Sequence, residues 1–171
     1  MEEMNRISGV IVDTAYRLHS RIGPGLMESV YESILTHALQ KRGLRVERQK
    51  AIPFEWEGVR VDEACKLDLL VEGCVVVELK STEKLHPVHA KQVLTYLRLL
   101  DLPIGLLINF GAVSLKDGVQ RVLNHRAPTA APGPQRPTPR TAPPPPRAAP
   151  RRGRSSLARA SNDRGARRPW R

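Results

Sequence analysis

The chain has 171 residues and a formal net charge of +11, from 28 lysines and arginines against 17 acidic residues. This length suits one ordinary domain. With no stretch of 18 consecutive apolar residues and no basic start leading into an apolar run, we expect neither a membrane-spanning helix nor a secretory leader. The two cysteines lack CxxC partners, which argues against iron–sulfur and Cys-based zinc sites and predicts a reduced, cytoplasmic protein.

The charge is distributed unevenly along the chain. Residues 1–126 hold 17 basic and 16 acidic side chains, whereas residues 127–171 hold 11 arginines, one aspartate and 11 of the 15 prolines. The second segment has almost no large apolar side chains, so we predict a disordered Pro/Arg-rich tail after a folded domain of residues 1–126. Its arginines could bind phosphate backbones without sequence preference, or the tail could be a low-complexity extension without a role.

Two helices are predicted first. Apolar side chains recur at spacings of three and four over residues 5–19 and again over residues 27–41, and a Gly-Pro-Gly sequence at 23–25 separates the two segments. Glu28, in the first turn of the second helix, lies beside its apolar stripe. It either favours the helix dipole or faces a functional site.

Short apolar runs then predict a sheet. Four strands are expected between residues 45 and 80, of which the last two form the most apolar, and therefore central, hairpin. Pro53 indicates an edge position for the first strand. A helix over residues 88–100 and strands over 104–109 and 119–123 complete an α/β sandwich about a mixed sheet.

The central hairpin carries three charged residues, Asp68, Glu78 and Lys80, that a buried strand pair has little structural use for. A two-residue loop would leave Glu78 facing away from Asp68, whereas a three-residue loop over 72–74 would pair the two carboxylates directly. In that case they form a hard oxygen site suited to Mg²⁺ or Mn²⁺, with Lys80 beside it. The alternative is that Glu78 and Lys80 lie at a strand end in solvent.

Other candidate sites are weaker. His86 and His89 are three apart at a helix start, but no third metal ligand is near, so solvated helix residues are the better interpretation. GxSxG, Walker and GxGxxG sequences do not occur, which leaves acyl transfer, P-loop hydrolysis and dinucleotide binding without support.

Four motifs occur in a particular order: a GxxExxY sequence at residues 25–31, then Asp68, then Glu78-Leu79-Lys80, then a QxxxY sequence formed by Gln92 and Tyr96. In this order and spacing the chain resembles the bacterial GxxExxY protein family of the PD-(D/E)XK nuclease superfamily, on its RecB and lambda-exonuclease-like branch. The resemblance covers roughly residues 5–125 and implies a restriction-endonuclease-like sandwich, with a central mixed β-sheet flanked by helices.

The resemblance also implies a role for each matching residue. Asp68 and Glu78 would be the principal metal ligands, together with the backbone carbonyl of Leu79, and Glu28 would reach the same metal directly or through water. Lys80 would orient or activate the attacking water and steady the charge on the phosphate. The substrate-binding residues would be Gln92 and Tyr96.

The resulting hypothesis is a Mg²⁺- or Mn²⁺-dependent nuclease that hydrolyses DNA phosphodiester bonds. The near-neutral charge of residues 1–126 weighs against a DNA groove acting alone, and a homodimer, a larger assembly or the arginine tail could supply the missing positive charge. The alternative is a non-catalytic nucleic-acid or phospholigand-binding module of the same fold. The sequence leaves open DNA or RNA, internal or terminal cutting, and strandedness.

Overall fold

The computed structural model describes residues 1–127, which form one sheet and four helices. The predicted tail lies outside the described residues apart from Ala127, and remains a prediction. Within the described part, no helix is long and apolar enough to cross a membrane. The elements in chain order are α1 (Glu2–Ile22), α2 (Glu28–Lys41), β1 (Val46–Trp56), β2 (Val59–Val71), β3 (Val75–Lys80), α3 (Pro87–Leu99), β4 (Ile104–Asn109), α4 (Leu115–Gly118) and β5 (Val119–Leu123).

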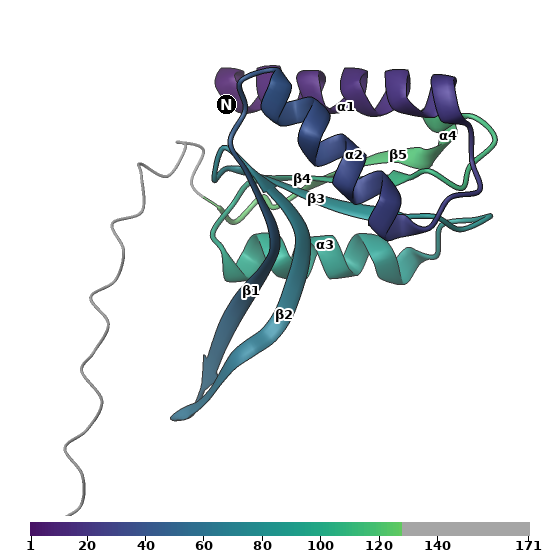
Figure 1. Ribbon diagram of the computed structural model, residues 1–171. Coiled ribbons are helices and arrows are strands. Elements are labelled where there is room, and N and C mark those ends of the chain that lie inside the picture. Colours follow the sequence, from purple (N-terminus) through teal and green to yellow (C-terminus); the bar gives the residue numbers. More distant parts are fainter. Residues whose placement is uncertain (128–171) are drawn as a thin grey trace, which may run out of the picture. The chain divides into compact units, whose positions relative to one another are not determined.

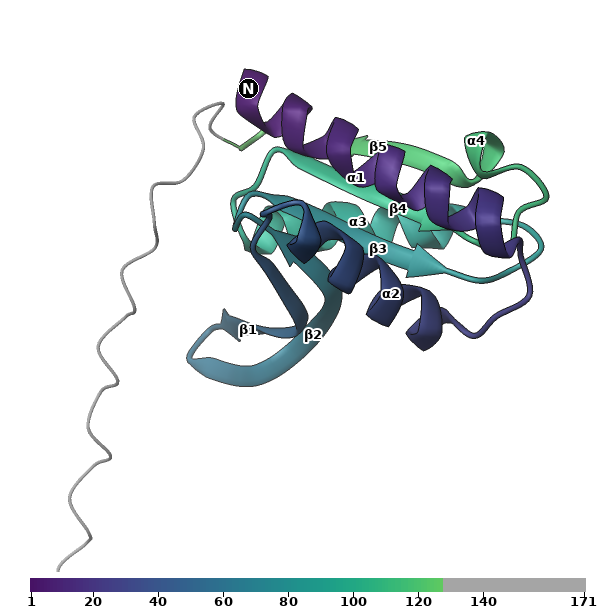
Figure 2. The ribbon, with the colours of Figure 1, turned by 45° about the horizontal axis from the view of Figure 1, so that its top comes forward.

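The sheet has the strand order β1-β2-β3-β4-β5. Strands β3 and β4 run parallel and the other neighbours run antiparallel, so the sheet is mixed. Helices α1 and α2 cover one face and α3 covers the other, as Figures 1 and 2 show. The predicted α/β sandwich about a mixed sheet is therefore confirmed, including the central place of the hairpin.

The central strand β3 explains why its sequence is apolar throughout. Val75, Val77 and Leu79 belong to the core under α1 and α2, whereas Val76 belongs to the core under α3. Because successive side chains on a strand alternate between faces, a strand covered on both sides must be apolar at nearly every position. By the same alternation Glu78 and Lys80 share the face of Val76, so a charged pair lies on the α3 side of the sheet.

The prediction of four strands between residues 45 and 80 was wrong, because there are three. The segment from residue 59 to 63 and the first strand of the hairpin form the single 13-residue strand β2, which pairs with β1 from Val59 to Val71. Asp62 and Glu63 do not break it, since this half of β2 is exposed and leaves the body of the fold together with β1 (Figure 1). The edge position of β1 is confirmed, and its register shifts around Pro53, which lacks a backbone donor.

The turn between β2 and β3 has three residues, because Val71 pairs with Val75 and Leu69 with Val77. Glu72 and Gly73 have positive φ angles of 51° and 66°. The loop predicted to pair the two carboxylates is the one that forms. One step further along this register, Asp68 lies across from Glu78.

Candidate active site

Asp68 is held against the neighbouring strand. Its Oδ2 accepts a 2.8 Å hydrogen bond from the backbone amide of Leu79, and its Oδ1 accepts a 3.3 Å hydrogen bond from the side-chain amide of Gln49. Burial raises the pKa of Asp68, while the Leu79 amide and the charge of Lys80 counteract this rise by stabilising the carboxylate. The carboxylate is therefore fixed from both sides in a partly desolvated position.

Glu78 is the most deeply buried carboxylate of the site, with 2% of its surface exposed. Its Oε1 accepts a 2.8 Å hydrogen bond from Lys80, but its Oε2 is buried and has no hydrogen-bond partner among residues 1–127. Burial first, and the charge of Asp68 second, raise the pKa of Glu78 to about 7. The fold therefore favours the protonated form of this carboxyl, with the hydrogen bond and charge of Lys80 opposing the effect.

Lys80 connects the oxygens of the hairpin. Its Nζ lies 2.8 Å from Oε1 of Glu78, 2.9 Å from the carbonyl oxygen of Leu79 and 3.8 Å from Oε1 of Glu28. Burial alone would lower the pKa of Lys80, but the hydrogen bond and charge of Glu78, with the charges of Glu28 and Asp68, raise it on balance. Lys80 is therefore an ammonium group at neutral pH.

Glu28 reaches this ammonium from the first residue of α2, and the loop before it is fixed by Tyr31. The Tyr31 hydroxyl donates to the carbonyl of Gly23 at 2.7 Å and accepts from the amide of Leu26 at 3.2 Å. Its fully buried ring stacks on Phe110 at a centroid distance of 4.3 Å. Within the GxxExxY motif, the tyrosine thus shapes the turn from which the glutamate points to Lys80.

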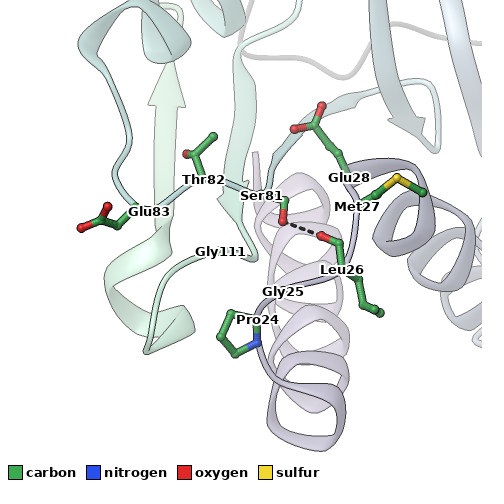
Figure 3. A pocket seen from close by; sticks show the side chains of 9 residues that line it. All are labelled: Pro24, Gly25, Leu26, Met27, Glu28, Ser81, Thr82, Glu83 and Gly111. Atoms are coloured by element: carbon green, nitrogen blue, oxygen red, sulfur yellow. Dashed lines mark hydrogen bonds between the residues drawn. The ribbon is translucent and has the colours of Figure 1, made fainter.

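An open pocket of about 640 Å³ adjoins this turn (Figure 3). The hydroxyl of Ser81 donates a 2.7 Å hydrogen bond to the carbonyl of Leu26, which ties the loop after β3 to the loop before α2. Glu28 is common to the pocket and to the cluster around Lys80. The pocket is lined by Pro24, Gly25, Leu26, Met27, Glu28, Ser81, Thr82, Glu83 and Gly111.

The far side of the pocket depends on Asn109, at the end of β4. Its nearly fully buried side chain accepts from the backbone amides of Thr82 and Gly111 and donates to the carbonyl of Thr82. A Cβ at Gly111 would lie 2.4 Å from the Thr82 carbonyl oxygen, so only glycine allows this approach. Sequence analysis missed Asn109, because asparagine is common at strand ends and its position therefore gives no functional signal.

Gln92 and Tyr96 lie one turn apart on α3 and contact each other. Gln92 Nε2 is 2.6 Å from the Tyr96 hydroxyl, which lies 3.4 Å from the carbonyl of Lys66, two residues before Asp68. Tyr96 is 5% exposed and packs in the core under α3. Tyr96 thus contacts the Asp68 strand from its α3 side and Gln92 contacts Tyr96, whereas within residues 1–127 neither side chain is hydrogen-bonded to Lys80.

His86 and His89 serve the helix start, as expected. The ring of His86 accepts from the amide of Val88, and the ring of His89 accepts from the amide of His86, so that the pair caps α3 reciprocally. The interpretation as helix residues, and not metal ligands, is the one these contacts favour.

The donor set of the site is compatible with a hard divalent cation. In the described part of the chain, no three side chains of His, Cys, Asp or Glu cluster closely enough to hold a metal by themselves. Two carboxylates and the Leu79 carbonyl nevertheless offer hard oxygens, and the unpartnered Oε2 of Glu78 is free to act as a ligand. Lys80 now bonds two of these oxygens, so a cation would have to compete with its ammonium group.

Fold and site together define an α/β protein whose central hairpin brings an aspartate, a glutamate and a lysine into one cluster. A family model described as the PD-(D/E)XK nuclease superfamily matches residues 5–122, which is more than half of the chain. The chain therefore belongs to the PD-(D/E)XK nuclease superfamily. No curated protein and no solved structure gives a significant match to it.

Proposed function

We propose that the protein is a metal-dependent nuclease that hydrolyses phosphodiester bonds of DNA with Mg²⁺ or Mn²⁺. The observation that carries this proposal is the buried, unpartnered Oε2 of Glu78 beside the carboxylate of Asp68. A buried carboxylate oxygen without a hydrogen bond is costly for folding. A bound cation would offset this cost, so a cation-binding function accounts for why the atom is there.

The proposed roles follow from the contacts of each residue. Asp68, Glu78 and the Leu79 carbonyl would hold the cation, with Glu28 reaching it directly or through water. A bound divalent cation supplies a water of lowered pKa and neutralises charge on the phosphate. The raised pKa of Lys80 keeps the side chain protonated. Lys80 is therefore better suited to hold a phosphate oxygen and orient the water through its positive charge than to act as a general base.

Substrate contacts are proposed on both sides of this cluster. Gln92 and Tyr96 would meet the substrate from α3, and the open pocket next to Glu28 gives an extended strand access from the other side. Among the described residues that line the pocket are Glu28 and Glu83 but no basic side chain, so the phosphate charge is left to Lys80 and the cation. Arginines of residues 127–171 or a second subunit would add the remaining positive charge.

Within the superfamily we infer the GxxExxY family and the RecB and lambda-exonuclease-like branch. Support comes from the way the motif residues act as one unit: Tyr31 fixes the turn, Gly25 has a φ of 117°, and Glu28 pairs with Lys80. A φ in this region favours glycine, which explains the first residue of the motif.

The test is cleavage by the purified full chain. Substrates are linear and circular DNA, single- and double-stranded, and a matched RNA, each with Mg²⁺, with Mn²⁺ or with EDTA. Lys80→Ala is compared with Lys41→Ala, an exposed lysine at the opposite end of α2 from Glu28. We expect metal-dependent cleavage by the wild type and by Lys41→Ala, and none by Lys80→Ala.

Three other results would change the assignment. Cleavage of RNA alone would replace the substrate, and cleavage that survives in Lys80→Ala would point to a contaminating enzyme. Absence of cleavage, with DNA binding that persists in EDTA, would favour the non-catalytic binding module.

A further inference from the structure

Gln49 has an unusual backbone conformation for its position. It lies in the interior of β1 with a φ of 47°, in the left-handed region that non-glycine residues rarely adopt. The register is the same on both sides of it, since Arg48 pairs with Leu69 and Lys50 with Leu67. Gln49 is therefore the residue opposite Asp68, and because it is exposed, packing in the core does not account for its conformation.

The side chain of Gln49 gives a reason for this conformation. Its Nε2 lies 2.7 Å from Oε2 of Glu32 and 3.3 Å from Oδ1 of Asp68. A primary amide has two N–H hydrogens, and here each can be donated to a different carboxylate. The amide thus separates two negative groups that would otherwise repel each other, since the charge of Glu32 disfavours the ionised form of Asp68.

Glu32 holds the side-chain amide of Gln49 in a fixed position. It is a buried carboxylate, 5% exposed, on α2, and its Oε1 accepts a 2.8 Å hydrogen bond from Nε of Arg48. Arg48 also donates to the hydroxyl of Ser33 at 3.1 Å. Hydrogen bonds therefore connect the exposed guanidinium of Arg48, through Glu32 and Gln49, to the carboxylate of Asp68.

We propose that Gln49 is a positioning residue for Asp68, held in its left-handed conformation so that the amide fixes the carboxylate from the side opposite the Leu79 amide. Buried Glu32, neutralised by Arg48, is the support that orients the amide. This inference rests on the proposed role of Asp68 as a metal ligand. Strain of this kind persists where surrounding contacts over-determine it, and it concentrates at functional sites.

The experiment measures metal binding directly. Mn²⁺ is titrated calorimetrically into the full chain as wild type, Gln49→Ala, Gln49→Gly, Asp68→Asn and the control Gln120→Ala, an exposed strand glutamine. Hydrogen-bond partners of metal ligands typically contribute about 10- to 100-fold in affinity. We expect a loss in this range for both Gln49 variants, no change for Gln120→Ala, and no measurable binding for Asp68→Asn.

Two further readouts separate positioning from a purely structural role. Both variants lose the amide, but only Gln49→Gly relieves the φ strain, so its metal-free melting temperature should exceed that of Gln49→Ala while both lose affinity for Mn²⁺. If the protein cleaves DNA, excess Mn²⁺ should restore cleavage in Gln49→Ala but not in Asp68→Asn.

The inference is overturned if both Gln49 variants bind Mn²⁺ within twofold of the wild type while Asp68→Asn does not bind. It is equally overturned if they differ from the wild type only in melting temperature. Wild-type affinity in Asp68→Asn would instead remove the proposed metal site itself, and the role of Gln49 with it.

Discussion

Ionisation of Glu78 should oppose folding when metal is absent. The fold raises the pKa of this carboxyl from 4.5 to about 7, so the folded chain binds the proton more tightly than the unfolded chain does. The corresponding stabilisation is fully present below about pH 4.5 and is lost as the pH rises through about 7. From these two pKa values, linkage gives a loss of about 2 kcal/mol in the free energy of unfolding between about pH 5.5 and pH 8.

The measurement is urea unfolding of the full chain in EDTA at these two pH values, followed by far-UV circular dichroism. Tryptophan fluorescence is a poor probe because Trp56 is already 65% exposed in the fold. Comparison with Glu78→Gln, which cannot ionise, cancels the titration of the histidines. We expect the wild type to lose about 2 kcal/mol relative to this variant as the pH rises.

Adding Mg²⁺ at pH 8 should reverse the loss in the wild type, because a ligand that binds only the folded state stabilises it. Glu78→Gln should gain little from Mg²⁺, and Glu55→Gln, on the exposed part of β1, should behave as the wild type in both experiments. A stability difference between the wild type and Glu78→Gln that stays constant from pH 5.5 to 8 would refute the reasoning from burial.

Three further substitutions, one of them with a control on α1, test separate parts of the site. Lys80→Ala removes the ammonium that now bonds Oε1 of Glu78 and the Leu79 carbonyl. Calorimetry should therefore show Mn²⁺ binding at least as tight as in the wild type, although cleavage is lost. Weaker Mn²⁺ binding would contradict the idea that the ammonium group competes with the cation for these oxygens. Tyr31→Phe deletes two hydrogen bonds of the turn before α2 and should cost about 1–3 kcal/mol in urea unfolding, and an unchanged midpoint would show that the turn does not need them. Gly111→Ala places a Cβ 2.4 Å from the Thr82 backbone and should cost about 1–3 kcal/mol, whereas Gly9→Ala, with open space on α1, should stabilise by up to about 1 kcal/mol. Equal effects of the two alanines would refute the steric argument.

Local periodicity was sufficient for most of the secondary structure. Strands β4 and β5 have the predicted bounds, and α2 and α3 begin and end within one residue of those expected. Apolar spacing reflects which face of an element is buried, so it can be recognised within a short window of sequence. Helix α4 was missed, because four residues are too few to show a period.

The charged residues of the hairpin were also recognisable in the sequence, but their convergence was not. Two loop lengths were compatible with the residues around Gly73, and only the pairing of Val71 with Val75 selected the one that brings Asp68 opposite Glu78. Strand register depends on hydrogen bonds and packing along the whole strand, and a shift of one residue would reverse the face of every side chain.

The sequence by itself therefore determined the fold class, the superfamily and the identity of the principal charged residues. Tertiary structure alone decided that Oε2 of Glu78 lacks a partner within the described part of the chain, that Lys80 bonds the oxygens a cation would need, and that Gln49 spans Glu32 and Asp68. The physical reason is that burial and hydrogen bonding arise between elements distant in sequence. A pattern of neighbouring residues records what each element needs in order to fold, but not which atoms the folded chain brings together.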